Sequence, residues 1–140
     1  MQSNYTSFDV DKHHIHLEFF VTDIMGIKHS VAGILDTGAP HTEFSDNFLL
    51  YAGFIQKKDE QIKIKQGLQT QKYGVIRLPS VEICGHKINS FDAYVSYFEK
   101  SWGIDALIGL DFFRRFLITI DYSNGFLITS PYKENIIQHN

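Results

Sequence analysis

An apolar run over residues 31–35 ends directly at the tripeptide Asp36-Thr37-Gly38. A continuous apolar run of this length is typical of a strand that is buried on both of its faces. A glycine two residues after the acid lets the chain turn sharply, so that backbone N–H groups can approach the carboxylate. The sequence therefore predicts a buried strand that presents one aspartate at its end, on a tight loop.

Further strands are predicted on both sides of this segment. Apolar and polar residues alternate over residues 15–21, which indicates a strand with one buried face, and residues 23–26 form a turn signal. Near the end of the chain, residues 116–121 and 126–130 flank an Asn124-Gly125 pair, which is a strong signal for a tight hairpin.

The middle of the chain predicts a two-stranded ribbon with a polar tip. Residues 62–65 and 73–77 alternate in hydropathy, and between them lies the glycine-bearing tip, residues 66–71. Residues 81–83 and 91–97 predict additional strands, separated by a turn at Gly85-His86.

Two short helices are predicted among these strands. Ser45 is a suitable N-cap for a helix that runs to Ala52, with Gly53 as its stop. A second helical turn is predicted over residues 111–115. Twelve Phe and seven Tyr residues favour sheets over helices, so the expected fold class is all-β with two short helices.

The composition indicates one globular domain over residues 1–140. Hydrophobic residues make up 44% of the 140 residues and charged residues 21%, as in ordinary globular proteins. Residues 1–12 are polar, which predicts a loose arm or an edge strand, and residues 133–140 are expected to form a loose tail.

The net charge limits the possible partners, and the cysteine content bears on the cellular compartment. A formal net charge of −3 provides no basic surface for nucleic acid or for an anionic membrane. Cys84 is the single cysteine and cannot form an internal disulfide. No secretory signal and no apolar stretch long enough to span a membrane are visible. We expect a cytoplasmic protein that binds neither nucleic acid nor membrane.

Two segments together resemble a known family. About seventy residues after Asp36-Thr37-Gly38-Ala39 and Thr42 comes Leu107-Ile108-Gly109, which runs on through 110–113 to Thr119-Ile120-Asp121. In these segments the chain resembles the retropepsin-like aspartic proteases, particularly their small bacterial members of one domain, and the resemblance extends from about His14 to Ile128. It implies a closed retropepsin-like β-barrel with a flap hairpin.

The resemblance also implies an activity and roles for individual residues. Two copies would form a homodimer, and Asp36 of each copy would supply one carboxylate of a catalytic pair that hydrolyses extended peptide or protein substrates. Residues that would support the active-site loop are Thr37, Gly38, Ala39 and Thr42. Residues that would pack beneath it are Leu107, Ile108 and Gly109. The flap would consist of Gln66, Gly67, Leu68, Gln69, Thr70 and Gln71.

Several alternatives remain open from the residues alone. Asp36 could be a capping aspartate, and the fold could serve as a catalytically silent peptide-binding or dimerisation module. His13, His14 and His16 could suggest a metal site, but no other ligands lie at metal-site spacing, so a solvated strand face is expected, with no metal and no cofactor. Trp102 is expected to be a core or interface anchor rather than a cleft residue.

The other acidic residues near the motif segments are given structural roles. Asp111 is interpreted as a first-turn helix residue, and Asp121 as a residue that precedes a tight turn. Together with Asp105, these two residues are the candidates for a second catalytic carboxylate within one chain. None of the three is followed by Thr-Gly, so none is expected to pair with Asp36.

Overall fold

The computed structural model describes residues 3–59 and 71–132. Its strands and helices follow one another along the chain as β1 (Asn4–Ser7), β2 (His16–Thr22), β3 (Lys28–Leu35), β4 (Glu43–Ser45), α1 (Asp46–Tyr51), β5 (Gln71–Ile83), β6 (His86–Tyr97), the short 3-10 helix η1 (Lys100–Trp102), β7 (Ala106–Ile108), α2 (Leu110–Phe113), β8 (Phe116–Asp121) and β9 (Phe126–Pro131).

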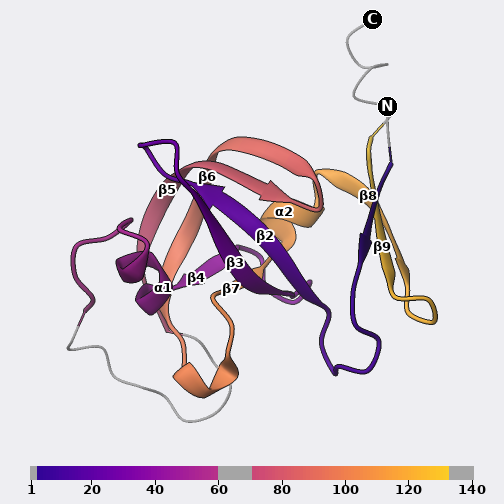
Figure 1. The fold of residues 1–140 in the computed structure, drawn as a ribbon, viewed down its shortest axis with the longest axis horizontal. Helices are drawn as coiled ribbons and strands as arrows, with labels where there is room; N and C mark the ends of the chain where they lie inside the picture. The colour runs from indigo at the N-terminus through magenta and orange to yellow at the C-terminus, as the bar shows by residue number, and fades with distance from the viewer. Residues whose placement is uncertain (1–2, 60–70, 133–140) are drawn as a thin grey trace, which may run out of the picture.

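The strands form two sheets. Six of them close into a barrel in the order β2-β3-β7-β4-β6-β5, and the other three form a small sheet in the order β1-β9-β8 at one side of the barrel (Figure 1). The two short helices lie between strands of the barrel and at the entry to the small sheet. This is the all-β fold with two short helices that the sequence predicted, with the closed barrel that the resemblance implied.

The hairpin of β2 and β3 follows the predicted alternation. Leu17, Phe19 and Val21 are buried, and the residues between them are exposed or half-buried. The turn closes through a hydrogen bond of 3.0 Å from the Gly26 N–H to the Asp23 carbonyl oxygen. Gly26 has a φ of 83°, which a residue with a side chain rarely adopts.

The prediction for β3 itself was wrong in one respect. Val31 is buried, but Ala32 is exposed, and Ile34 and Leu35 are only half-buried. The inner face packs closely, since a Cβ on Gly33 would lie 2.8 Å from the Phe19 ring. The outer face of β3 has no covering layer within the described residues, so an apolar run that reads as doubly buried is partly exposed in the single chain.

Helix α1 begins and ends close to the predicted residues. The Phe48 N–H donates to the Ser45 hydroxyl oxygen at 3.5 Å, which makes Ser45 the N-cap. Phe48 and Leu49 face the core, and Gly53, with a φ of 83°, follows the helix end. Helix α2 begins one residue before the predicted start.

The structure corrects the prediction of separate strands over residues 73–77 and 81–83. They belong to one strand, β5, which pairs with β6 from Gln71 to Ile83. The ladder passes Pro79 without a pair at that position, since proline has no N–H to donate. The turn between the two strands is formed by Cys84 and Gly85, whose φ values are 53° and 77°, and not by Gly85-His86.

The small sheet contains both ends of the described chain. The hairpin of β8 and β9 is confirmed, with the Gly125 N–H donating to the Asp121 carbonyl oxygen at 2.9 Å. Strand β1 pairs with β9, so residues 4–7 form an edge strand and not a loose arm. The tail predicted over residues 133–140 lies outside the described residues.

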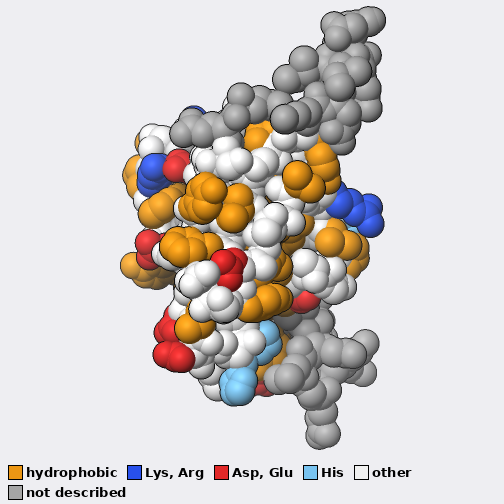
Figure 2. Space-filling model, turned by 90° about the vertical axis from the view of Figure 1, so that its right-hand side faces the viewer, with side chains coloured by type: hydrophobic (Ala, Val, Ile, Leu, Met, Phe, Trp, Pro, Cys, Tyr) orange, Lys and Arg blue, Asp and Glu red, His pale blue; other side chains and the backbone are white. Residues whose placement is uncertain are grey.

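One face of the small sheet carries exposed hydrophobic side chains. By strand alternation Tyr5, Phe126 and Leu117 share this face, with exposed fractions of 68%, 39% and 63%. Figure 2 views the molecule from the side of this sheet and shows hydrophobic side chains gathered there. The opposite face of the sheet contributes Leu127, which is fully buried, to the core.

The core fills the barrel with aromatic and branched side chains. Five of these side chains are at most 1% exposed: Phe19, Phe44, Phe91, Phe112 and Ile108. These side chains come from five separate elements, so the barrel is closed by long-range packing. No helix in the described parts of the chain is long and apolar enough to cross a membrane.

Candidate active site

Asp36 lies at the end of β3, held between two neighbouring strands of the barrel. Its own N–H donates to the Ile108 carbonyl oxygen at 2.9 Å, and the N–H of the preceding Leu35 donates to the Ile15 carbonyl oxygen at 3.0 Å. Strand β3 runs parallel to β7, with Leu35 opposite Ile108. The backbone of Asp36 is therefore fixed on both sides before the loop begins.

The loop after Asp36 folds back on the carboxylate. The Gly38 N–H donates to Asp36 Oδ1 at 3.0 Å, and the Ala39 N–H donates to the Asp36 carbonyl oxygen at 3.1 Å. Ala39 is buried, whereas Thr37 and Gly38 are exposed. Asp36 is half-buried, and its other carboxylate oxygen, Oδ2, has no hydrogen-bond partner among the described residues. The loop thus presents an accessible carboxylate in a fixed orientation.

Gly109 lies directly beneath this loop. A Cβ at this position would be 2.7 Å from the Ala39 carbonyl oxygen and 2.7 Å from the His41 carbonyl carbon. The next residue, Leu110, donates its N–H to that same Ala39 oxygen at 2.8 Å. Ile108 is buried in the core and Leu107 is half-buried. The structure therefore brings residues 107–109 against the Asp36 loop, and only glycine fits at the point of contact.

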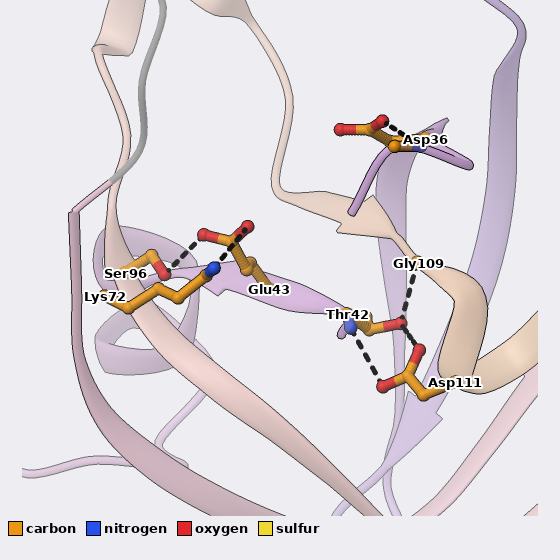
Figure 3. Close-up of polar contacts among 8 residues, drawn as sticks. Asp36, Thr42, Glu43, Lys72, Ser96, Gly109 and Asp111 are labelled. Carbon is orange, nitrogen blue, oxygen red and sulfur yellow. Dashed lines mark hydrogen bonds and ion pairs between the residues drawn. The ribbon is translucent and has the colours of Figure 1, made fainter. Parts of the chain in front are cut away.

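Thr42 and Asp111 clamp the loop from below, as Figure 3 shows. The fully buried Thr42 hydroxyl donates to Asp111 Oδ1 at 2.6 Å and accepts from the Gly109 N–H at 3.0 Å. The Thr42 N–H donates to Asp111 Oδ2 at 2.9 Å. The side chain of Asp111 thus has a structural partner 69 residues away, which its interpretation as a first-turn helix residue missed. No local pattern in the sequence indicates this contact.

A cavity of about 390 Å³ opens beside Asp36. Its apolar wall is formed by Ile34, Leu35, Trp102, Ile104 and Leu107, and its polar side by Asp36, His14 and His16. Trp102, expected as a core or interface anchor, lines this cavity with a half-buried side chain, and its ring centroid lies 5.7 Å from that of the buried Phe98. The two histidines also line it, and do not merely form a solvated strand face.

A larger hollow of about 710 Å³ lies between β1 and the outer surface of β2 and β5. Its lining includes Asn4, Glu18 and Glu82 but none of the residues around Asp36. Volume alone would favour it as a binding site. The smaller cavity has the apolar wall and the converging polar groups that ligand sites usually combine, so we place the candidate site there.

One polar residue of the cavity, His16, has a shifted pKa. Partial burial, the Lys12 ammonium and the neighbouring His14 all lower the pKa of His16 below its ordinary value, while Asp9 acts in the opposite direction. Within residues 3–59 and 71–132, no group of three His, Cys, Asp or Glu side chains is arranged to hold a metal ion.

A second polar network, which the sequence interpretation missed, joins the start of β5 to the barrel. The buried Glu43 accepts a hydrogen bond of 2.9 Å from the Ser96 hydroxyl and lies 3.9 Å from the Lys72 ammonium (Figure 3). The Tyr73 hydroxyl donates to Asp46 Oδ2 at 2.8 Å. Burial and the bond to Asp46 raise the pKa of Tyr73 to about 12. These contacts anchor the strand that follows residues 60–70.

The flap prediction can be followed only in part. Gln71 is the first residue of β5, and residues 66–70 lie outside the described part of the chain.

Comparison with known proteins identifies the fold. The chain is similar to a retropepsin-like aspartic protease from Rickettsia conorii, with 22% sequence identity and a TM-score of 0.62, over 91% of this chain and 90% of that one. It is also similar to the retroviral protease-like domain of Ddi1 from Leishmania major, with 19% identity and a TM-score of 0.53, over 86% of this chain and 97% of that domain. No protein-family model matches the chain, and no curated protein matches it.

Proposed function

We propose that this chain is an aspartic endopeptidase that hydrolyses peptide bonds in extended polypeptide segments, and that Asp36 from each of two copies forms its catalytic pair. The observation that carries the proposal is the state of Asp36. It sits at the end of a fixed strand, on a loop braced from below, with one carboxylate oxygen unpartnered among the described residues and an apolar cavity of about 390 Å³ beside it.

The nearby acids support the proposal of a second copy. Among the described residues, Asp36 is the only carboxylate that lines the cavity. Asp105 accepts a hydrogen bond from the Ala32 N–H at 2.9 Å, and Asp111 is bound by Thr42. Both are therefore engaged in holding the backbone, which supports a second reacting carboxylate supplied by another copy. The exposed Thr37 and Gly38, with the partly exposed apolar side chains of β3, provide a surface on which a second copy can meet the first.

Two adjacent Asp36 carboxylates would act as one acid and one base. Two carboxyl groups about 3 Å apart cannot both ionise, so the pair shares one proton, as in aspartic proteases generally. The ionised carboxylate takes a proton from a water molecule, and the oxygen of that water attacks the scissile carbonyl carbon. The protonated carboxyl gives its proton to the carbonyl oxygen. The carboxyl that took the water proton then gives it to the amide nitrogen, and the other carboxylate takes back a proton from a hydroxyl of the tetrahedral intermediate, whose collapse breaks the C–N bond.

The role of the flap is proposed from the resemblance to the retropepsin-like proteases. Residues 66–71 would form the flap over the bound peptide, which would pair its backbone with the flap as an added strand. We also propose a cytoplasmic location, because Cys84 is a free, buried cysteine and the chain has no second cysteine for an internal disulfide.

The test is cleavage of a diverse peptide mixture by the purified protein and by the Asp36→Asn variant, read by mass spectrometry across about pH 4 to 7. The proposal requires cleavage that the variant lacks, while both proteins show the same circular dichroism spectrum and the same molecular mass in solution. If the folded wild-type protein binds peptides and cuts none of them, it is a catalytically silent binding module instead.

A further inference from the structure

Two histidines line the same cavity as Asp36. His16 is the first residue of β2, and His14 lies two residues before it. His16 pairs with Ile34 in the antiparallel ladder, and the Leu35 N–H donates to the Ile15 carbonyl oxygen. Directly opposed residues share a face of the sheet, so His16 and Ile34 lie on one face. Both line the cavity, together with His14 and Asp36.

The histidines form a polar rim beside an apolar wall. Their ring centroids are 6.5 Å apart, with an interplanar angle of 80°. No hydrogen bond or ion pair joins either imidazole to Asp36 within the described residues, so both rings are available to a ligand. The apolar wall around Trp102 suits one large apolar side chain, and the rim suits an adjacent group that can accept a hydrogen bond from an imidazole.

From this arrangement we infer that His14 and His16 make the cavity selective for peptides that carry an acidic side chain next to a large apolar one. The inference rests on the proposed function, because it takes the ligand of the cavity to be the peptide that is cleaved. It goes further by assigning a charge preference to two residues outside the Asp-Thr-Gly loop.

The charged groups around the rim determine when this preference operates. Partial burial disfavours a proton on His16 most, Lys12 and His14 add to this effect, and Asp9 opposes it. The carboxylate of Asp36 lines the same cavity. Because its pKa is lowered, His16 is largely uncharged near neutral pH, and at acidic pH a bound carboxylate stabilises its charged form. We expect glutamate peptides to bind about two- to fivefold more tightly than glutamine peptides at pH 5.5, and the two to bind equally at pH 8.

The experiment uses the Asp36→Asn protein, so that binding is measured without cleavage. Trp102 is the only tryptophan in the chain and lines the cavity, so its fluorescence reports occupation of the cavity. The probes are matched peptide pairs in which Glu or Gln stands immediately before or after Phe. The tested proteins carry, in addition, H14Q, H16Q or both, and H13Q is the matched control, because His13 is exposed and does not line the cavity.

The expected result is a glutamate preference at pH 5.5 that both single variants reduce, that the double variant abolishes, and that H13Q retains. Equal binding of the Glu and Gln peptides at both pH values would overturn the inference. It would also be overturned if none of the peptides bound to the protein. A preference that H14Q and H16Q leave intact would overturn the assignment to these residues. If the preference is found while the wild-type protein cuts no peptide, the proposed function fails and the selectivity of the cavity stands.

Discussion

Replacing Thr42 by valine removes the hydroxyl that ties the active-site loop to helix α2 while keeping the shape of the side chain. In the native structure this hydroxyl donates to Asp111 Oδ1 at 2.6 Å and accepts from the Gly109 N–H at 3.0 Å. Thr42 is fully buried, so water cannot replace either bond without rearrangement. Valine leaves a carboxylate oxygen short of a donor and a buried N–H without an acceptor.

The magnitude follows from these two losses. A buried group left without its partner costs about 1–3 kcal/mol, and a charged group lies at the upper end of that range. We therefore expect Thr42→Val to lower the free energy of unfolding by roughly 3–5 kcal/mol, a large share of the about 5–15 kcal/mol typical of a domain. The bond from the Thr42 N–H to Asp111 Oδ2 remains in the variant, which keeps the loss at two contacts.

Urea unfolding followed by circular dichroism measures this change, with Thr119→Val as the control. Thr119 is exposed on β8, so its replacement is expected to change the free energy of unfolding by less than about 0.5 kcal/mol. Asp111→Asn completes a double-mutant cycle, in which Thr42→Val and Asp111→Asn should be strongly non-additive. A loss below about 1 kcal/mol in Thr42→Val, or additive effects in the cycle, would refute the clamp.

Two further expectations concern the packing beneath the loop and the anchor of β5. Gly109→Ala should destabilise the protein by about 1–3 kcal/mol or more, because the new Cβ would lie 2.7 Å from backbone atoms. The control Gly74→Ala should not destabilise it, because its Cβ would have ordinary contacts of 3.5 Å or more. Equal unfolding midpoints for the two variants would contradict this prediction. Tyr73→Phe should cost about 1–3 kcal/mol, because Asp46 Oδ2 loses its donor, whereas Tyr122→Phe, at an exposed position, should be neutral. The raised pKa of Tyr73, about 12, means that its stabilising effect is complete below the ordinary value of 10 and is lost as the pH rises from 10 to about 12. The stability difference between wild type and Tyr73→Phe should therefore shrink over that interval, and a difference independent of pH would contradict the assignment.

Much of the fold could be predicted from the sequence because its signals are local. The alternation along β2, the Ser45 cap and the Asn124-Gly125 turn each depend on a few neighbouring residues, and each was found in the structure. The strand end at Asp36 was predicted in the same way, from the apolar run that precedes it.

The features that were missed depend on contacts between distant segments. Asp111 meets Thr42 only because β4 and α2 converge under the loop. His14 and His16 line a cavity only because β2 pairs with β3 in one particular register. The apolar run before Asp36 also could not reveal that its outer face is uncovered by the residues that the structure describes, since burial on both faces and contact with a second copy produce the same pattern.

The proposed catalytic pair requires Asp36 from two copies, and subunit mixing tests this requirement. Wild-type protein and Asp36→Asn protein are mixed in equal amounts, allowed to exchange, and assayed for peptide cleavage at constant total concentration. If activity needs two native Asp36 residues, random pairing should leave about one quarter of the wild-type rate. A rate of about one half would show that each native chain acts alone and would contradict the proposed pair.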